Sequence, residues 1–209
     1  SGVLSEPKRD SPHEHLFGMI KGYLARKHRG SRGSYVSLLH RLDRDTSGVM
    51  VAALSKVGEQ LEDQFRSHEI DRQYLALVEG QVEKEEQTIR FPLEKGDFEG
   101  GRKVKIVPEG KGMRALTHVK VKERYTNATL LTVRVDTGRT HQVRIHMAEI
   151  GHPLIGDKIY GAGTFPFPRH ALHALILAFN HPRTKRRMRF ESKLAADLEQ
   201  LVDQLRGSV

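Results

Sequence analysis

The sequence contains no cysteine, so neither disulfide bonds nor thiolate metal sites can contribute to its structure or chemistry. It also has no apolar run near the roughly 20 residues that a membrane-spanning helix needs. Residues 1–10 lack the apolar core that defines a secretory signal. We therefore expect a protein with no membrane association that acts in a reducing compartment, the cytoplasm.

Acidic residues are outnumbered by basic ones. The 209-residue chain has 35 Lys and Arg against 26 Asp and Glu, which gives a net charge of +9. Such a surplus favours a polyanionic partner, most often a nucleic acid, although lysines can also serve only to solvate a surface. Charged residues are 29% and hydrophobic residues 37%, as expected for one globular domain with a sizeable core.

One short stretch concentrates polar and charged groups between apolar segments. His40–Gly48 reads H-R-L-D-R-D-T-S-G, and the apolar run Val49–Leu54 follows it. That run predicts a buried strand, because it is short, rich in branched residues and bounded by Gly48 and Ser55. Charged groups on a turn that buried elements hold are typical of an active site, but an ordinary connecting turn also uses Asp, Thr, Ser and Gly.

The same nine residues identify a family. His40–Gly48 resembles the H-R-L-D-x-x-T-S-G signature of the RluA-type pseudouridine synthases, which belong to the RluA/RsuA superfamily. The resemblance implies that Asp43 is the catalytic nucleophile. Asp45 is the rival by position, although a turn aspartate more commonly stabilises its own backbone. Proximity to Asp43 suggests that Arg41 fills the space that a flipped uridine leaves, and Arg44 is a candidate phosphate ligand.

A tyrosine is the second candidate catalytic residue. Residues 72–80 read R-Q-Y-L-A-L-V-E-G, a strand by their branched and aromatic content. They resemble the family's R-x-Y-x-A-x-V-x-G strand, which implies that Tyr74 lies in the active site. In that position Tyr74 would either accept the proton from C5 of uracil or stack on the base. Without the resemblance, a tyrosine in a strand would be interpreted as a core aromatic residue with a bonded hydroxyl.

The third polar stretch is residues 136–151, D-T-G-R-T-H-Q-V-R-I-H-M-A-E-I-G. Its pattern predicts a helix capped by Thr140 and ended by Gly151, with Val143 on its apolar face. G-R-T-H-Q-V-R-I-H matches the family, and the resemblance implies that Arg139 pairs with the catalytic aspartate. Arg144, like Arg44, is a candidate RNA-phosphate ligand.

Two histidines in this stretch raise the question of a metal. His141 and His146 are five residues apart, which places them poorly on one helical face, and the H-E-x-x-H zinc pattern is missing. We therefore expect no metal site.

The remaining pattern predicts an α+β fold, a mixed and mainly antiparallel β-sheet flanked by helices. Further matches to the family at residues 152–161 and 169–174 extend the resemblance over nearly the whole chain. We expect residues 1–209 to form a single catalytic domain that lacks the first strand of the family core and any N-terminal RNA-binding domain. The expected elements are helices at 13–28, after Ser55 and around Leu194–Leu205, and strands at 88–93, 103–107, 115–123, 128–135 and 169–181.

The resemblance implies an isomerase that converts uridine to pseudouridine in ribosomal or transfer RNA, in which case Asp43→Asn abolishes turnover. The reaction neither oxidises nor hydrolyses, so we expect no cofactor, and we expect a monomer. Two alternatives remain. One is a catalytically inactive RNA-binding module on the same fold. The other is a hydrolase that uses Asp43 and His40, which needs a second carboxylate or a metal nearby.

Overall fold

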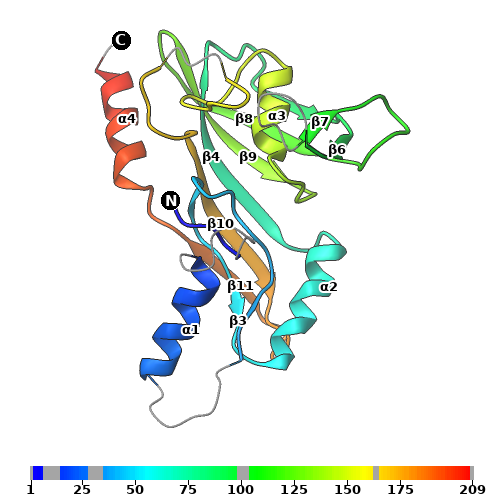
Figure 1. Ribbon diagram of the computed structural model, residues 1–209. Helices are drawn as coiled ribbons and strands as arrows, with labels where there is room; N and C mark the ends of the chain where they lie inside the picture. Colours follow the sequence, from blue (N-terminus) through cyan, green and yellow to red (C-terminus); the bar gives the residue numbers. More distant parts are fainter. Residues whose placement is uncertain (1, 7–14, 28–34, 98–103, 162–164, 208–209) are drawn as a thin grey trace.

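A computed structural model describes residues 2–6, 15–27, 35–97, 104–161 and 165–207 (Figure 1). In this part of the chain, one seven-stranded sheet dominates the architecture, with the order β11-β10-β4-β9-β8-β5 and with β2 paired to β10. Every neighbouring pair along that order is antiparallel, and the β2–β10 pair is parallel. The predicted α+β fold with a mainly antiparallel sheet is confirmed. The strands are β2 (Ser47–Gly48), β4 (Asp71–Glu79), β5 (Glu86–Ile89), β8 (Thr117–Arg124), β9 (Ala128–Val135), β10 (Leu172–Asn180) and β11 (Arg187–Glu191).

Smaller elements surround this sheet. Two further two-stranded sheets pair β1 with β3 and β6 with β7. In the described part of the chain, no helix is long and apolar enough to cross a membrane. The remaining elements are β1 (Ser37–Leu38), β3 (Ala52–Ala53), β6 (Leu93–Lys95), β7 (Val104–Ile106), α1 (Leu16–Lys27), the 3-10 helix η1 (Lys56–Glu59), α2 (Gln60–Arg66), α3 (Gln142–Glu149) and α4 (Ala196–Arg206).

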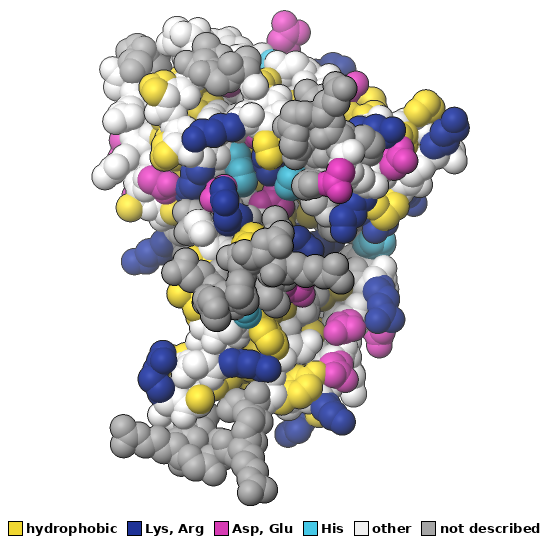
Figure 2. All heavy atoms as spheres, in the orientation of Figure 1, with side chains coloured by type: hydrophobic (Ala, Val, Ile, Leu, Met, Phe, Trp, Pro, Cys, Tyr) yellow, Lys and Arg dark blue, Asp and Glu magenta, His cyan; other side chains and the backbone are white. Residues whose placement is uncertain are grey.

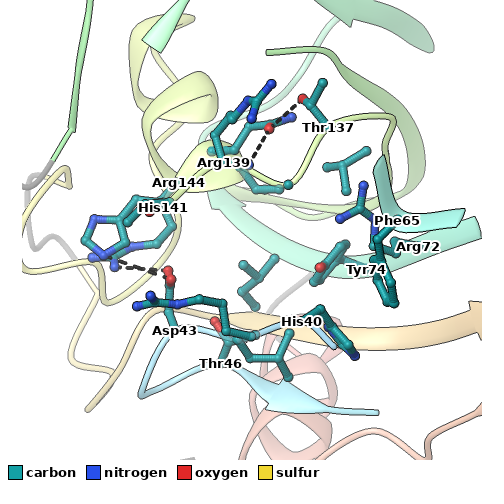
Figure 3. A pocket seen from close by; sticks show the side chains of 18 of the residues that line it. His40, Asp43, Thr46, Phe65, Arg72, Tyr74, Thr137, Arg139, His141 and Arg144 are labelled. Carbon is teal, nitrogen blue, oxygen red and sulfur yellow. Dashed lines mark hydrogen bonds and ion pairs between the residues drawn. The ribbon is translucent and has the colours of Figure 1, made fainter. Parts of the chain in front are cut away.

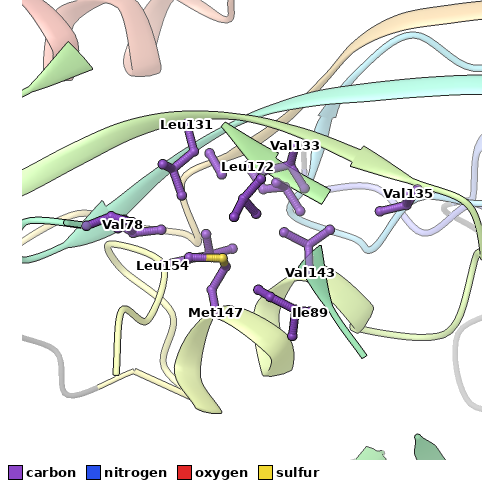
Figure 4. Packing of buried hydrophobic residues seen from close by; sticks show 12 residues of the cluster. Val78, Ile89, Leu131, Val133, Val135, Val143, Met147, Leu154 and Leu172 are labelled. Carbon is purple, nitrogen blue, oxygen red and sulfur yellow. The ribbon is translucent and has the colours of Figure 1, made fainter. Parts of the chain in front are cut away.

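Helices α3 and α4 cover opposite faces of the sheet (Figure 1). Successive side chains of a strand point to opposite faces, and β4 divides its residues accordingly. Ala76 and Val78 pack with Val143 and Met147 of α3, the cluster drawn in Figure 4. Leu75 and Leu77 pack instead with residues of α4, including Leu198 and Leu201. The two faces of one strand therefore build two separate cores.

The alternation of β4 places Tyr74 on the α3 face, where it packs against the same cluster as Ala76. The predicted strand at 72–80 is confirmed within one residue at each end. The apolar face predicted for α3 is confirmed, since Val143 and Met147 are buried. Gly151 follows that helix with a φ of +84°, the left-handed conformation of a helix stop. The predicted Thr140 cap is wrong, because His141 occupies the N-cap position and its side chain makes no capping bond.

The prediction of a buried strand at Val49–Leu54 is also wrong. Only β3 is a strand there, and Leu54 is 57% exposed. Val49 and Val51 are partly buried against a third core cluster, which includes Phe179 of β10. The run is apolar because it packs on that cluster as irregular chain, and apolar composition alone does not separate such a segment from a strand.

Candidate active site

The turn that carries the polar stretch is fixed by its neighbours on β10. The backbone N–H of Thr46 donates to the carbonyl of Asp43 at 3.0 Å and closes the turn. The next two residues form β2, which pairs in parallel with His173 and Ala174. Gly48 has a φ of +118°, and a Cβ atom there would lie 2.1 Å from the Ala174 carbonyl oxygen. Only glycine allows β2 to approach β10 this closely.

Two buried histidines hold the side chains of the turn. The Thr46 hydroxyl bonds to His170 Nε2 at 2.8 Å, and the Ser47 hydroxyl bonds to His173 Nδ1 at 2.9 Å. Burial, together with the charge of Arg144, lowers the pKa of His170 to about 4, so this imidazole is neutral at neutral pH. The polar turn is therefore bonded to the segment that leads into β10 and to β10 itself, and these contacts fix the direction in which Asp43 projects.

A cavity of about 450 Å³ opens beside the turn, and Asp43 lies in its wall. Figure 3 shows Asp43 on the same side of the cavity as Arg144 and His141, with Tyr74 and His40 lining another part. Asp45 is outside the described lining and forms an ion pair with its neighbour Arg44 at 3.2 Å. Of the two aspartates that the sequence offered, only Asp43 therefore faces the cavity.

The structure corrects the predicted partner of Asp43. Arg144 Nη1 lies 3.3 Å from Asp43 Oδ2, whereas Arg139 Nε donates to the carbonyl of Arg114 at 3.1 Å. Arg139 also lines the cavity, and its backbone N–H donates to the Gln142 side chain at 3.1 Å. The turn before α3 thus directs Arg139 away from Asp43, and the first turn of the helix brings Arg144 to it.

Arg144 binds a second carboxylate as well. Its Nε and Nη2 atoms donate to Asp157 at 2.7 and 2.8 Å, a two-pronged pair in which Asp157 is fully buried. Burial opposes both charges, but the pairing prevails: it lowers the pKa of Asp157 and raises that of Arg144. Asp157 also accepts the backbone N–H groups of Ile159 and Tyr160. The predicted phosphate contact of Arg144 is corrected accordingly, because a side chain that is 6% exposed and bound to two carboxylates is not a surface ligand.

Tyr74 reaches the cavity from β4. Its hydroxyl is neutral at neutral pH, because burial raises the pKa of the phenol and Asp43 adds to the effect, against an opposing charge from Arg72. Arg41 lines the cavity with an exposed side chain, and Arg44 is 62% exposed outside it. The two histidines considered for a metal lie in different surroundings: His141 faces Asp43, whereas His146 is buried between Thr117 and the Phe91 carbonyl.

Sequence reasoning missed two participants in this arrangement. Asp157 lies in a stretch that matches the family, but its only signal was a Gly-Asp dipeptide, which is usual in turns. His141 was considered only as a metal ligand. Its Nε2 atom lies 4.0 Å from Asp43 Oδ1.

The sequence of this chain also matches a known protein family. The sequence model described as RNA pseudouridylate synthase matches residues 1–149, which include Asp43, Tyr74, His141 and Arg144. The chain belongs to the RNA pseudouridylate synthase family. The resemblance seen in the sequence is thereby confirmed.

The chain is also similar in sequence to individual pseudouridine synthases. The chain is 36% identical over 220 residues to ribosomal large subunit pseudouridine synthase C of Escherichia coli, covering 99% of the chain and 67% of that protein. It is 34% identical to ribosomal large subunit pseudouridine synthase D of Zymomonas mobilis, with 98% and 68% coverage. It is 39% identical to the uncharacterized RNA pseudouridine synthase YlyB of Bacillus subtilis, with 81% and 55% coverage. The chain therefore spans roughly half to two thirds of the length of these relatives.

Two solved structures share the fold. Human RNA pseudouridylate synthase domain containing 4 aligns with a TM-score of 0.77 at 21% identity, over 98% of this chain and 87% of that one. Human RNA pseudouridylate synthase domain containing 1 aligns with a TM-score of 0.70 at 24% identity, over 98% and 94%. These likenesses confirm the fold of the pseudouridylate synthase domain.

Proposed function

We propose that this protein isomerises uridine to pseudouridine in RNA, with Asp43 as the nucleophile. The observation that carries the proposal is the Asp43–Arg144 ion pair in the wall of the cavity. The reaction breaks the bond between C1′ and N1, turns the uracil, and joins C1′ to C5. A carboxylate can supply the nucleophile for such a transfer, and a fixed guanidinium can orient it. Membership in the pseudouridylate synthase family supports this reaction.

The shape of the site fits a single nucleoside. Ligand cavities of roughly 300–1,000 Å³ hold small molecules, and this one is about 450 Å³. A base inside an RNA helix cannot reach Asp43, so the target uridine must be flipped out at a cost of a few kcal/mol. Arg41 has an exposed side chain at the cavity and lies two residues before Asp43. We assign to it the space that the flipped nucleotide leaves in the RNA.

Tyr74 takes the stacking role in this proposal. A buried phenol whose pKa is raised above 10 is a poor proton acceptor at neutral pH. Its ring lines the cavity from β4, on the side away from Arg144 (Figure 3). An aromatic ring in this position gives the turning uracil a flat apolar surface.

Ribosomal RNA is the substrate class that we propose. The relatives from Escherichia coli and Zymomonas mobilis are named as ribosomal large subunit enzymes. The net charge of +9 suits any RNA. On the face seen in Figure 2, lysine and arginine side chains are spread over the surface among acidic ones. Arg44, beside the catalytic turn, remains a candidate phosphate ligand, and so does the exposed basic group on the β10–β11 hairpin, which comprises Arg183, Lys185, Arg186 and Arg187.

The hydrolase alternative is less well supported by the geometry. It requires a second carboxylate that is free to act on substrate or water. Asp157, which shares Arg144 with Asp43, has no exposed side-chain surface and binds Arg144 with both oxygens. His40 is also engaged, because its Nε2 atom accepts the backbone N–H of Val51 at 3.0 Å.

The decisive experiment compares two neighbouring aspartates. The parent, Asp43→Asn and Asp45→Asn are incubated with transcribed large-subunit ribosomal RNA and with transfer RNA, and pseudouridine is mapped chemically. We expect modification of ribosomal RNA by the parent and by Asp45→Asn, and none by Asp43→Asn with its fold retained by circular dichroism. Activity in Asp43→Asn would refute the nucleophile. Binding without modification by the parent would instead indicate the RNA-binding module.

A further inference from the structure

We propose that His141 is the catalytic group that accepts the proton from C5 of the uracil, an inference that rests on the proposed function. Its imidazole lines the cavity, is 14% exposed, and brings Nε2 to 4.0 Å from Asp43 Oδ1. If Asp43 forms the bond to the nucleoside, the groups that exchange protons with that nucleoside must lie within a few ångströms of Asp43. His141 meets this condition.

The hydrogen bonds of His141 set its tautomer. Its Nδ1 atom lies 3.0 Å from the hydroxyl of Tyr160, and that hydroxyl donates to the carbonyl of Val104 at 3.4 Å. We assign the Tyr160 hydrogen to the Val104 carbonyl, so that the hydroxyl oxygen accepts from His141 and Nδ1 carries the hydrogen. The lone pair is then on Nε2, the atom that faces Asp43 in the cavity. This is the tautomer that a proton acceptor at that position needs.

The backbone of His141 is held in a conformation that few residues adopt. Its φ and ψ of 53° and 19° are in the left-handed region. A residue other than glycine is strained in this conformation, and such strain concentrates at functional sites. The following residue anchors the turn, because the Gln142 amide donates to the Leu116 carbonyl and to the Thr117 hydroxyl, both at 2.9 Å. The left-handed turn thus aims the imidazole at Asp43 from the start of α3.

The other candidate acceptors are less suited. His40 also lines the cavity, but its Nε2 lone pair already accepts the backbone N–H of Val51, so its other nitrogen carries the hydrogen. His68 lines the cavity near Asp136, where its charge acts on that carboxylate. Tyr74 has a phenol whose pKa is raised, mainly by burial. Because these three groups are less suited to accept the proton, we assign the role to His141, the neutral base beside Asp43.

Burial keeps His141 neutral at neutral pH, so that one ring nitrogen is free to accept a proton. Burial lowers its pKa, Asp43 and Asp157 oppose that effect, and Arg144 and Arg41 reinforce it. Tyr160 packs edge-on against its ring, with centroids 5.6 Å apart. The net direction is downward from 6.5, so most molecules carry an unprotonated Nε2 at pH 7.

The proton balance of the reaction is simple. Asp43 bonds to C1′ as the C1′–N1 bond breaks and leaves its electron pair on N1. C5, which still carries its hydrogen, then bonds to C1′ as the bond to Asp43 breaks and returns its electron pair to the carboxylate. Removal of that hydrogen as a proton by Nε2 returns its bonding electrons to the ring, and N1 takes up a proton from solvent. The imidazolium of His141 passes its proton to solvent. One proton is lost and one is gained, so the product is an isomer of uridine.

The test measures C5–H cleavage directly in His141→Asn. Asparagine tolerates the left-handed backbone but has no basic nitrogen. Single-turnover release of tritium from RNA with tritium at uridine C5 is followed against pH. We expect His141→Asn to be about 10²–10⁴-fold slower, the usual contribution of a general base, and to lose the acid limb that the parent shows below pH 6.5. When the uridine carries deuterium at C5, the kinetic isotope effect should be larger for His141→Asn than for the parent, because proton removal becomes rate-limiting in the variant.

The matched control is His68→Asn, the same substitution at another cavity histidine with a left-handed backbone, φ 62°. It should keep the isotope effect and acid limb of the parent. RNA with 5-fluorouridine has no hydrogen at C5, so His141→Asn should still break the C1′–N1 bond in it at the rate of the parent.

Tritium release by His141→Asn at the rate of the parent would overturn the inference and leave the proposed function intact. Loss of the 5-fluorouridine reaction in that variant would also overturn it, by indicating a structural role. A parent that released no tritium from any RNA would overturn the proposed function and this inference together.

Discussion

Arg144 joins two aspartates that lie far apart in the sequence, Asp43 and Asp157. Its guanidinium gives Nε and Nη2 to Asp157 at 2.7 and 2.8 Å and leaves Nη1 for Asp43 at 3.3 Å. The buried pair fixes the plane of the guanidinium, so the position of its third nitrogen relative to Asp43 is determined by the fold. A fixed charge of this kind needs no reorganisation when the carboxylate reacts.

Arg144→Lys should therefore be much more harmful than Arg139→Lys. A lysine keeps the charge but cannot bond to both carboxylates in the geometry of a guanidinium. Within the described residues, Arg139 donates to the Arg114 carbonyl and bonds to no carboxylate. We expect a loss of about 10²–10³-fold in kcat for Arg144→Lys, the effect of removing one preorganised donor, and less than about tenfold for Arg139→Lys. Single-turnover assays on the same RNA measure both, and the reverse order would refute the assignment.

Asp157→Asn should destabilise the protein strongly. The change leaves a buried guanidinium with only Asp43 as its charged partner, and breaking a buried pair costs about 3–5 kcal/mol. The control is Asp71→Asn, which removes the exposed pair with Arg187 and should change stability by at most about 1 kcal/mol. Urea unfolding gives both free energies. Equal effects in the two variants would show that the Arg144–Asp157 pair is not structural.

Local patterns predicted the regular elements well. The strand predicted at 128–135 has the bounds of β9, and the branched and aromatic content of residues 72–80 predicted β4 within one residue at each end. Burial of Leu198 and Leu201 confirms the apolar stripe of the last helix. These elements could be predicted because their side-chain period is a property of consecutive residues.

The contacts within the site could not be predicted in this way. Arg139 and Arg144 both lie in the stretch G-R-T-H-Q-V-R, and the left-handed turn at His141 separates the arginine that faces away from Asp43 from the one that meets it. A positive φ is uncommon for any residue other than glycine, so the sequence does not indicate which residue adopts it. The bond between Thr46 and His170 joins residues 124 apart, and no local pattern predicts a partner at that separation.

Lowering the pH from about 6.5 to about 4 should destabilise the fold through two buried histidines. Burial lowers the pKa of His40 and of His170 from 6.5 to about 4. Between these two pH values the histidines are protonated in the unfolded chain but not in the folded chain. Their contribution to the free energy of unfolding is therefore fully present above pH 6.5 and is lost as the pH falls to about 4. Each histidine contributes up to roughly 3 kcal/mol.

Urea unfolding between pH 7.5 and 4.5 measures this slope. His170→Gln should flatten it, because one of the protons taken up on unfolding is no longer bound. A slope unchanged by His170→Gln would show that this imidazole is not held neutral in the folded protein.

Substitutions at two glycines can separate the effect of the close approach of β2 to β10 from the effect of backbone strain. Gly48 and Gly110 both have positive φ, of +118° and +84°, but a Cβ on Gly110 meets nothing within 4 Å, whereas one on Gly48 meets the Ala174 backbone. Gly110→Ala should cost only the backbone strain, about 1–2 kcal/mol. Gly48→Ala should add the displacement of β2 and move the turn that carries Asp43. We therefore expect Gly48→Ala to lower both the free energy of unfolding and turnover, and Gly110→Ala to lower only the former. Equal behaviour of the two variants would mean that the β2–β10 contact does not position Asp43.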